Sequence, residues 1–157
     1  MDDDDRIFQQ PANKGILDCL RYLGRGWKGP LSCHPSETDD PYYELGTHPD
    51  LVEVLWDKLT ANIPIDTRWV IHGRPVLVHP ETSTIFAFAT GTHTYAFRIP
   101  FELRQKAKAA HASQQYKYPD GSVLDLTKYD ADWVFGRIID DEEELCLTAF
   151  QSAGDVT

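Results

Sequence analysis

Six histidines and three cysteines are among the side chains of this chain that could ligate a metal or act as nucleophiles. Three of the histidines, His72, His79 and His93, fall within residues 68–99. Imidazole is a common zinc ligand, and each ligating nitrogen lies about 2.0 to 2.1 Å from the metal. A metal site in this block therefore requires a fold that brings at least two of these rings together.

Residues 68–99 predict two successive β-hairpins, and strand geometry keeps their histidines apart. His72 and His79 fall near opposite ends of the first hairpin, about 13 Å apart at roughly 3.3 Å per residue. His72 and His93 fall at the same end of the sheet but on its first and fourth strands, about 14 Å apart at roughly 4.8 Å per strand. We therefore expect neither a metal site nor a cofactor.

The cysteines offer a second kind of chemistry. Cys33 directly precedes His34 in a proline-rich segment, and a nearby imidazole can lower the pKa of a thiol and activate it as a nucleophile. Neighbouring side chains rarely point at each other, so this pair alone does not specify a hydrolase. Cys19 and Cys146 fall in expected helices, where free cysteine usually packs as a small apolar group.

The segment Gly24–Gly29 matches the G-x-G-x-x-G pattern of dinucleotide-binding loops. That motif requires a strand before it and a helix after it, whereas here an expected helix comes before it and Pro30 follows. We therefore expect no dinucleotide site. Arg21, Arg25 and Lys28 remain as a basic cluster that predicts an anion-binding loop, with an ordinary solvated loop as the alternative.

The second expected hairpin, Ile85–Ile99, turns at Gly91–Thr92. A two-residue turn places Phe88 opposite Tyr95. The predicted faces are then an aromatic one and a small, flat one that suits a helix or a second copy of the chain. The aromatic face carries Phe86, Phe88, Tyr95 and Phe97, and the flat face, a possible homo-oligomer contact, carries Ala87, Ala89 and Ala96.

The first expected hairpin turns near Gly73–Arg74, with Trp69, Ile71, Val76 and Val78 on one face and Val70 and Leu77 on the other. Joined by residues 80–83, the two hairpins predict a four-stranded or larger antiparallel meander. One rim of this sheet combines imidazoles, hydroxyls and a guanidinium, which predicts a ligand site for a small anion or a partner's carboxylate. The alternative is ordinary turn chemistry. The residues of this rim site are His72, Arg74, Thr92 and His93, with Thr90 beside them, and the opposite rim carries Arg68, His79, Glu81 and Arg98.

Helices are expected on either side of this meander in the chain. Their apolar spacing and capping residues predict helices at 11–23, in 47–64, at 101–112 with Arg104, Lys106 and Lys108 facing water, and at 145–151. Residues 122–126 and 133–139 look extended, although a helix remains open for 133–139. The sequence thus predicts a single α+β domain over 1–157, with helices packed mainly on the aromatic face and a frayed acidic segment at 1–10.

The composition limits the function classes. The formal charge of −10 and the pI of about 4.9 argue against nucleic-acid binding and favour a basic protein partner. Apolar runs are too short for a membrane span, and the three scattered cysteines are typical of a reducing compartment, so we expect a soluble cytoplasmic protein.

No complete catalytic constellation is present, so the sequence predicts a non-enzymatic interaction or regulatory module, as an immunity or regulatory subunit would be. A small-molecule-binding protein or hydrolytic enzyme, with a pocket between the sheet and loop 24–40, is the alternative.

Overall fold

The computed structural model describes residues 3–23, 33–35, 49–90, 94–109, 113–117, 120–136 and 142–156. Its strands are β1 (Cys33–Pro35), β2 (Arg68–Ile71), β3 (Arg74–Val78), β4 (Ile85–Thr90), β5 (Thr94–Arg98), β6 (Gln115–Lys117), β7 (Val123–Asp125) and β8 (Trp133–Gly136). Its longer helices are α1 (Asp3–Gln9), α2 (Lys14–Leu23), α3 (Pro49–Glu53), α4 (Phe101–Ala109) and α5 (Glu142–Gly154). Short helical turns are η1 (Pro11–Asn13), η4 (Val54–Lys58), η5 (Ile65–Thr67) and η6 (Leu126–Lys128).

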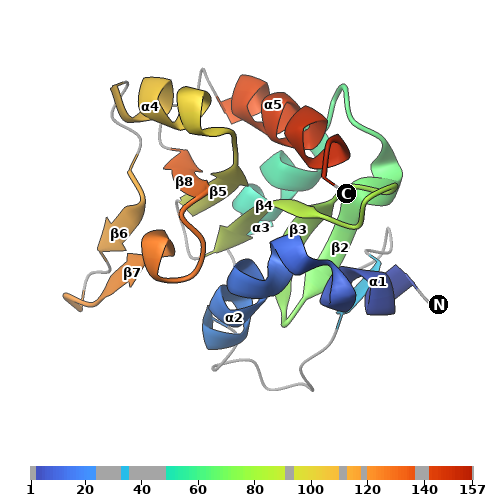
Figure 1. The fold of residues 1–157 in the computed structure, drawn as a ribbon, viewed down its shortest axis with the longest axis horizontal. Coiled ribbons are helices and arrows are strands. Elements are labelled where there is room, and N and C mark those ends of the chain that lie inside the picture. The colour runs from blue at the N-terminus through green and yellow to red at the C-terminus, as the bar shows by residue number, and fades with distance from the viewer. Residues whose placement is uncertain are drawn as a thin grey trace.

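An antiparallel sheet in the order β1-β2-β3-β4-β5-β8 forms the centre of the fold, and β6 pairs with β7 in a small second sheet (Figure 1). The predicted α+β fold and antiparallel meander are confirmed, because β2 to β5 follow one another in both sequence and space. Two further strands extend this meander at its edges. One is β8, which settles residues 133–136 as a strand, and the other is β1, in a segment where only a loop was expected.

The β2–β3 hairpin closes through His72 and Gly73, one residue earlier than the Gly73–Arg74 turn that the sequence suggested. Ile71 pairs with Arg74, so the loop has two residues, and both have positive φ, 50° at His72 and 76° at Gly73. Positive φ at both central positions is what a type I′ turn requires, and this turn matches the twist of the strands it joins. The predicted division of this hairpin into two faces is confirmed, with Trp69 and Val76 in one core and Val70 and Leu77 in the other.

The register predicted for the β4–β5 hairpin was wrong by one residue. Thr90 pairs with Thr94, so three residues separate the strands, and Phe88 lies opposite Ala96 while Ala89 lies opposite Tyr95. A one-residue slip moves every side chain of a strand to the other face. Aromatic rings therefore pack beside alanines rather than beside one another. The predicted Gly91–Thr92 turn itself lies outside the described residues.

A bulge between β3 and β4 further separates the observed faces from the predicted ones. Leu77 pairs with Ala87 and Val78 pairs with Ile85, so Phe86 is the extra residue between them. Phe86 consequently joins the same core cluster as Ala87, while Ile85 and Phe88 join the opposite one. The single aromatic face predicted from the sequence does not exist, because each face carries aromatic side chains.

Helices cover both faces of the sheet rather than mainly one. The core on one side combines the strands with side chains of α3, η4 and α5, and the core on the other side includes Ile7 from α1 and Leu20 from α2 (Figure 1). Ala87, Ala89 and Ala96 are fully buried, with the first two in one core and Ala96 in the other. The alanine surface predicted for homo-oligomer contact is therefore absent.

The structure agrees with several helix predictions and corrects others. Helices α2 and α5 fall where expected, and Ile16, Leu17 and Leu20 of α2 are buried. Helix α4 also begins at Phe101 as predicted, but Arg104 is half-buried and does not face water: it donates to Ile99 O and pairs with Asp132. Within the described ranges, no helix is both long and apolar enough to span a bilayer.

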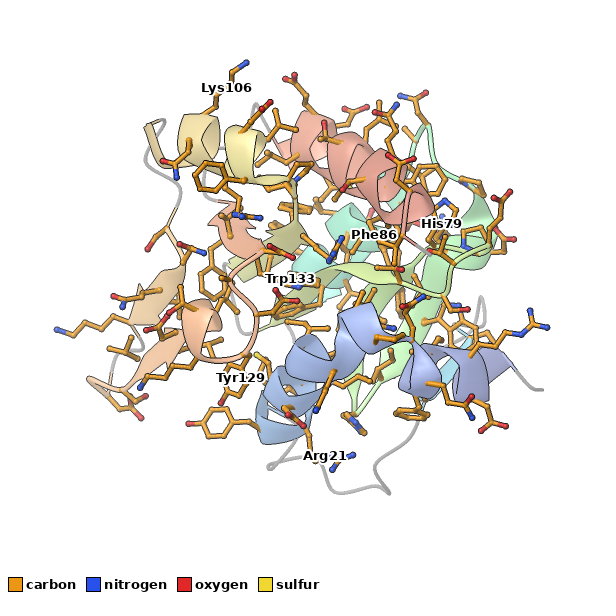
Figure 2. All side chains as sticks on the ribbon, in the orientation of Figure 1. Arg21, His79, Phe86, Lys106, Tyr129 and Trp133 are labelled. Atoms are coloured by element: carbon orange, nitrogen blue, oxygen red, sulfur yellow. The ribbon has the colours of Figure 1, made fainter. Side chains whose placement is uncertain are left out.

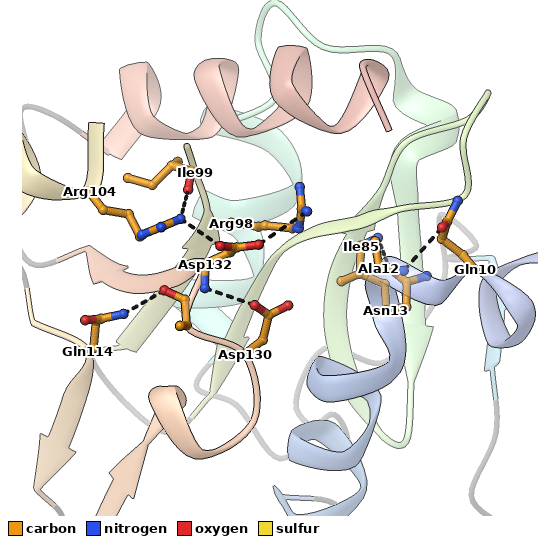
Figure 3. A network of polar contacts seen from close by, with 11 residues as sticks. Gln10, Ala12, Asn13, Ile85, Arg98, Ile99, Arg104, Gln114, Asp130 and Asp132 are labelled. Carbon is orange, nitrogen blue, oxygen red and sulfur yellow. Dashed lines mark hydrogen bonds and ion pairs between the residues drawn. The ribbon is translucent and has the colours of Figure 1, made fainter. Parts of the chain in front are cut away.

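Residues 3–9, within the stretch 1–10 that was expected to be frayed, form α1, which buries Ile7. Asn13 fastens this layer to the sheet. Its Nδ2 donates to Ile7 O at 2.9 Å and Ser83 O at 2.8 Å. Its Oδ1 accepts from Ile85 N at 2.8 Å, as Figure 3 shows. Since Asn13 is fully buried, its amide replaces water for three backbone groups at once.

We expect Asn13→Ala to lower the free energy of unfolding by about 3 kcal/mol, because it leaves buried backbone groups without partners. The matched control is Gln10→Ala, which removes two half-buried bonds, one from Gln10 Nε2 to Thr82 O and one from Ala12 N to Gln10 Oε1. That change should cost about 1 kcal/mol. Urea denaturation followed by circular dichroism measures both, and equal losses would contradict the role assigned to Asn13.

Candidate functional site

The β2–β3 turn and the end of α2 bring together residues from the two sites predicted from the sequence. A guanidinium nitrogen of Arg74 donates to Leu23 O at the last residue of α2. Arg21, exposed near the end of the same helix (Figure 2), is near enough to His72 to affect its pKa electrostatically. Arg21, His72 and Arg74, the described members of the predicted rim site and the predicted anion-binding loop, thus lie in one region. Thr92, His93, Arg25 and Lys28, the other members of these two predicted sites, lie outside the described residues.

His72 lies inside this region as a buried group. It is only 3% exposed, its ring centroid lies 6.2 Å from that of Phe8, and neither ring nitrogen has a hydrogen-bond partner within the described part of the chain. Burial lowers the pKa of His72, and the positive charge of Arg21 lowers it further. A neutral, buried imidazole offers no charge to an anion at neutral pH, whereas Arg21 is an exposed cation beside it.

A groove between α1 and α2 leads away from Arg21. Its volume is about 600 Å³, and its lining runs from Phe8 and Pro11 to Arg21 along the exposed side of α2. Phe8 is 42% exposed and supplies an apolar wall. Lys14 and Asp18, on the same lining, carry opposite charges, so the groove favours a ligand with both apolar and polar parts over a simple anion.

The residues predicted on the opposite rim are engaged in structural contacts. His79 is buried, stacks on Phe150 at 4.7 Å, and its Nδ1 accepts hydrogen bonds from the backbone N–H groups of Glu81 and Thr82. Arg68 pairs with Asp57 at 3.2 Å. These contacts connect the rim to α5 and η4, so His79 and Arg68 have a structural role.

Sequence reasoning missed a third polar cluster, in which Arg98 and Arg104 flank Asp132. Arg98 was placed on a rim and Arg104 in water, and Asp132 was not singled out. No local signal joins them, because they come from β5, α4 and the turn before β8 (Figure 3). An antiparallel strand next to β5 could have been a clue, since Arg98 pairs with Trp133 and so lies close to Asp132.

The described cysteines give little support to thiol chemistry. Cys19 and Cys146 are fully buried, and burial raises the pKa of each to about 12, so both remain protonated thiols. Cys33 is half-buried in β1, while the side chain of His34 lies outside the described residues. So does most of loop 24–40, which leaves the predicted pocket there untested. Among the residues that the structure describes, no three His, Cys, Asp or Glu side chains gather as metal ligands.

We expect stability to fall with pH below the ordinary histidine pKa of 6.5 because of His72. The unfolded imidazole takes up a proton there while the folded one, with its lowered pKa, resists it, so the contribution of His72 is complete above pH 6.5 and is lost as the pH falls. His72→Asn should remove this part of the pH dependence, and asparagine before Gly73 preserves a type I′ turn. The urea denaturation midpoints of the wild type and of His72→Asn, each at pH 8 and pH 5.5, measure the effect. An equal loss of stability in the two proteins between these pH values would contradict it.

The buried thiols should react only when the chain opens. With an aromatic disulfide reagent at pH 8, we expect the rapid phase to come from Cys33 and to disappear in Cys33→Ser. Cys19 and Cys146 should then react in urea or at the slow rate of native-state opening. A rapid phase that persists in Cys33→Ser would show that one of them is accessible.

Neither family models, nor curated proteins, nor solved structures provide a match for this chain. The functional interpretation of this region therefore depends on its geometry.

Proposed function

We propose that this chain is a non-enzymatic interaction module that binds a basic partner protein through its acidic surface. The observation that carries the proposal is the formal charge of −10, combined with the position of the charged side chains. Arg68 is paired with Asp57, and Arg98 and Arg104 are paired with Asp132. Ion pairs within the chain thus offset part of the positive charge of these arginines. Many carboxylates, by contrast, are exposed: Asp5, Asp18, Asp50, Glu53, Asp66, Glu81, Glu102, Asp120, Glu143, Glu144 and Asp155.

An excess of surface charge favours a partner of the opposite sign. Complementary charge steers two proteins together and raises the association rate, and it disfavours partners of like charge. A phosphate backbone is such a like-charged partner, so nucleic acid is not the expected ligand. An immunity or regulatory subunit that neutralises a basic protein would have this character.

Two further features support a binding role in the cytoplasm. The sheet is packed on both faces, with large side chains such as Trp56 and Trp133 fully buried, so its interior is filled. Cys19 and Cys146 are buried free thiols, as is usual for proteins of a reducing compartment.

The proposal predicts that immobilised protein captures a basic protein from its own lysate, and that capture weakens as salt rises from about 0.05 to 0.3 M because screening shortens the range of the charges. Two double charge reversals locate the surface. Glu53→Lys with Asp66→Lys alters the end of α3 and η5, and Glu143→Lys with Glu144→Lys alters the start of α5. We expect one pair to reduce capture at least about tenfold and the other to leave it nearly unchanged.

Each pair serves as the control for the other, since both make the same change in net charge. Circular dichroism confirms that each variant folds. The proposal fails if no partner is captured repeatedly, or if capture is insensitive to salt and to both charge reversals.

A further inference from the structure

Two arginines share one carboxylate beside the start of α4. Arg98 Nη2 lies 3.5 Å from Asp132 Oδ2, and Arg104 Nη1 lies 3.0 Å from Asp132 Oδ1. The three side chains come from separate parts of the chain and converge in the fold (Figure 3). Burial raises the pKa of Asp130, and the charges of Arg98 and Arg104 act to lower it, so a second carboxyl group lies beside the two guanidinium groups.

The cluster also has more donors than acceptors. Arg104 Nη1 makes a second bond, to Ile99 O at 2.7 Å, but the buried Nε of Arg98 has no hydrogen-bond partner among the described residues. A buried donor that makes no hydrogen bond destabilises the fold.

A pocket of about 210 Å³ opens at this cluster. Arg98, Arg104 and Asp132 line it together with Pro100, Phe101 and Ser152, which adds a hydroxyl from α5. At roughly 30 Å³ for each water molecule in the liquid, this volume equals about seven waters. It is large enough for a small oxyanion and the few atoms of the ligand that bear it.

The walls of the pocket suit an anion in two further ways. Phe101 begins α4, and the first N–H groups of a helix carry partial positive charge. The Phe101 ring is 63% exposed, and the guanidinium carbon of Arg104 lies 5.5 Å from its centroid. That ring offers an apolar surface for the carbon part of a ligand, next to the charged donors.

We propose that this pocket binds a small oxyanion, a carboxylate or phosphate group, between Arg98 and Arg104. Guanidinium groups recognise both kinds of group through paired N–H···O bonds, and a pair of them provides more donors than Asp132 alone can use. Asp132 has two effects: it holds the arginines in place and partly neutralises them. The turn that carries Asp132 is itself held by the bond from its backbone N–H to Asp130 Oδ1.

Calorimetric titration of the full chain with inorganic phosphate and, separately, with acetate tests the site and separates its two sources. We expect at least one anion to bind, with the tighter one identifying the class. Arg98→Lys keeps the charge but removes Nε and the paired donors, and should weaken binding about tenfold or more. Asp132→Asn removes the competing charge and should tighten binding.

Arg68→Lys is the matched control, because Arg68 also pairs with one aspartate and also has a buried Nε without a partner. It should leave anion affinity unchanged. Thermal unfolding shows whether Asp132→Asn folds, and if it does not, the comparison of Arg98→Lys with Arg68→Lys decides. The proposal is overturned if neither anion binds the wild-type chain with a dissociation constant of about 10 mM or lower. Equal losses in the two lysine variants, or weaker binding by a folded Asp132→Asn, would overturn it as well.

Discussion

Burial on both faces of the central strands is the constraint on which the rest of this structure depends. Val76 and Leu77 are neighbours in β3, point to opposite sides, and are both completely covered. A sheet in this position needs a helical layer on each side. Helices α1 and α2, which precede β2, cover one face, and α3 and η4, which also precede β2, cover the other together with α5, which follows the last strand (Figure 1). The N-terminal layer in turn needs Asn13, whose side chain satisfies backbone groups that the packing removes from water.

Two-sided burial also explains why the register of β4 and β5 was hard to predict. When one face of a strand is exposed to solvent, the alternation of polar and apolar residues specifies which side chains point to the core. Here the side chains on both faces of the strands are mainly apolar. The difference between the two registers is then one of size. The observed pairing sets Phe88 beside Ala96 and Tyr95 beside Ala89, which spreads the ring volume over both cores. Such volume matching involves the helices that fill each core, and no pattern within the hairpin contains that information.

The polar groups follow the same division between local and distant causes. His72 could be recognised as a special residue, but its burial under Phe8 and beside Arg21 depends on where α1 and α2 settle. Arg98, Arg104 and Asp132 meet only because β8 pairs with β5 and α4 folds back next to them. Of the described parts of the candidate regions, the sequence identified Arg21, His72 and Arg74 individually, and the fold made the first two neighbours and tied Arg74 to the end of α2.

By itself, the sequence determined the class of fold, the antiparallel meander, the positions of α2 and α5, and the strongly acidic character of the chain. These depend on short-range properties: side-chain period, capping and turn residues, and a sum of charges. Tertiary structure decided the register of β4 and β5, the bulge at Phe86, the edge strand β1 and the polar cluster at Asp132. Each of these depends on contacts between segments far apart in the chain, where packing volume and the pairing of buried polar groups outweigh local preference.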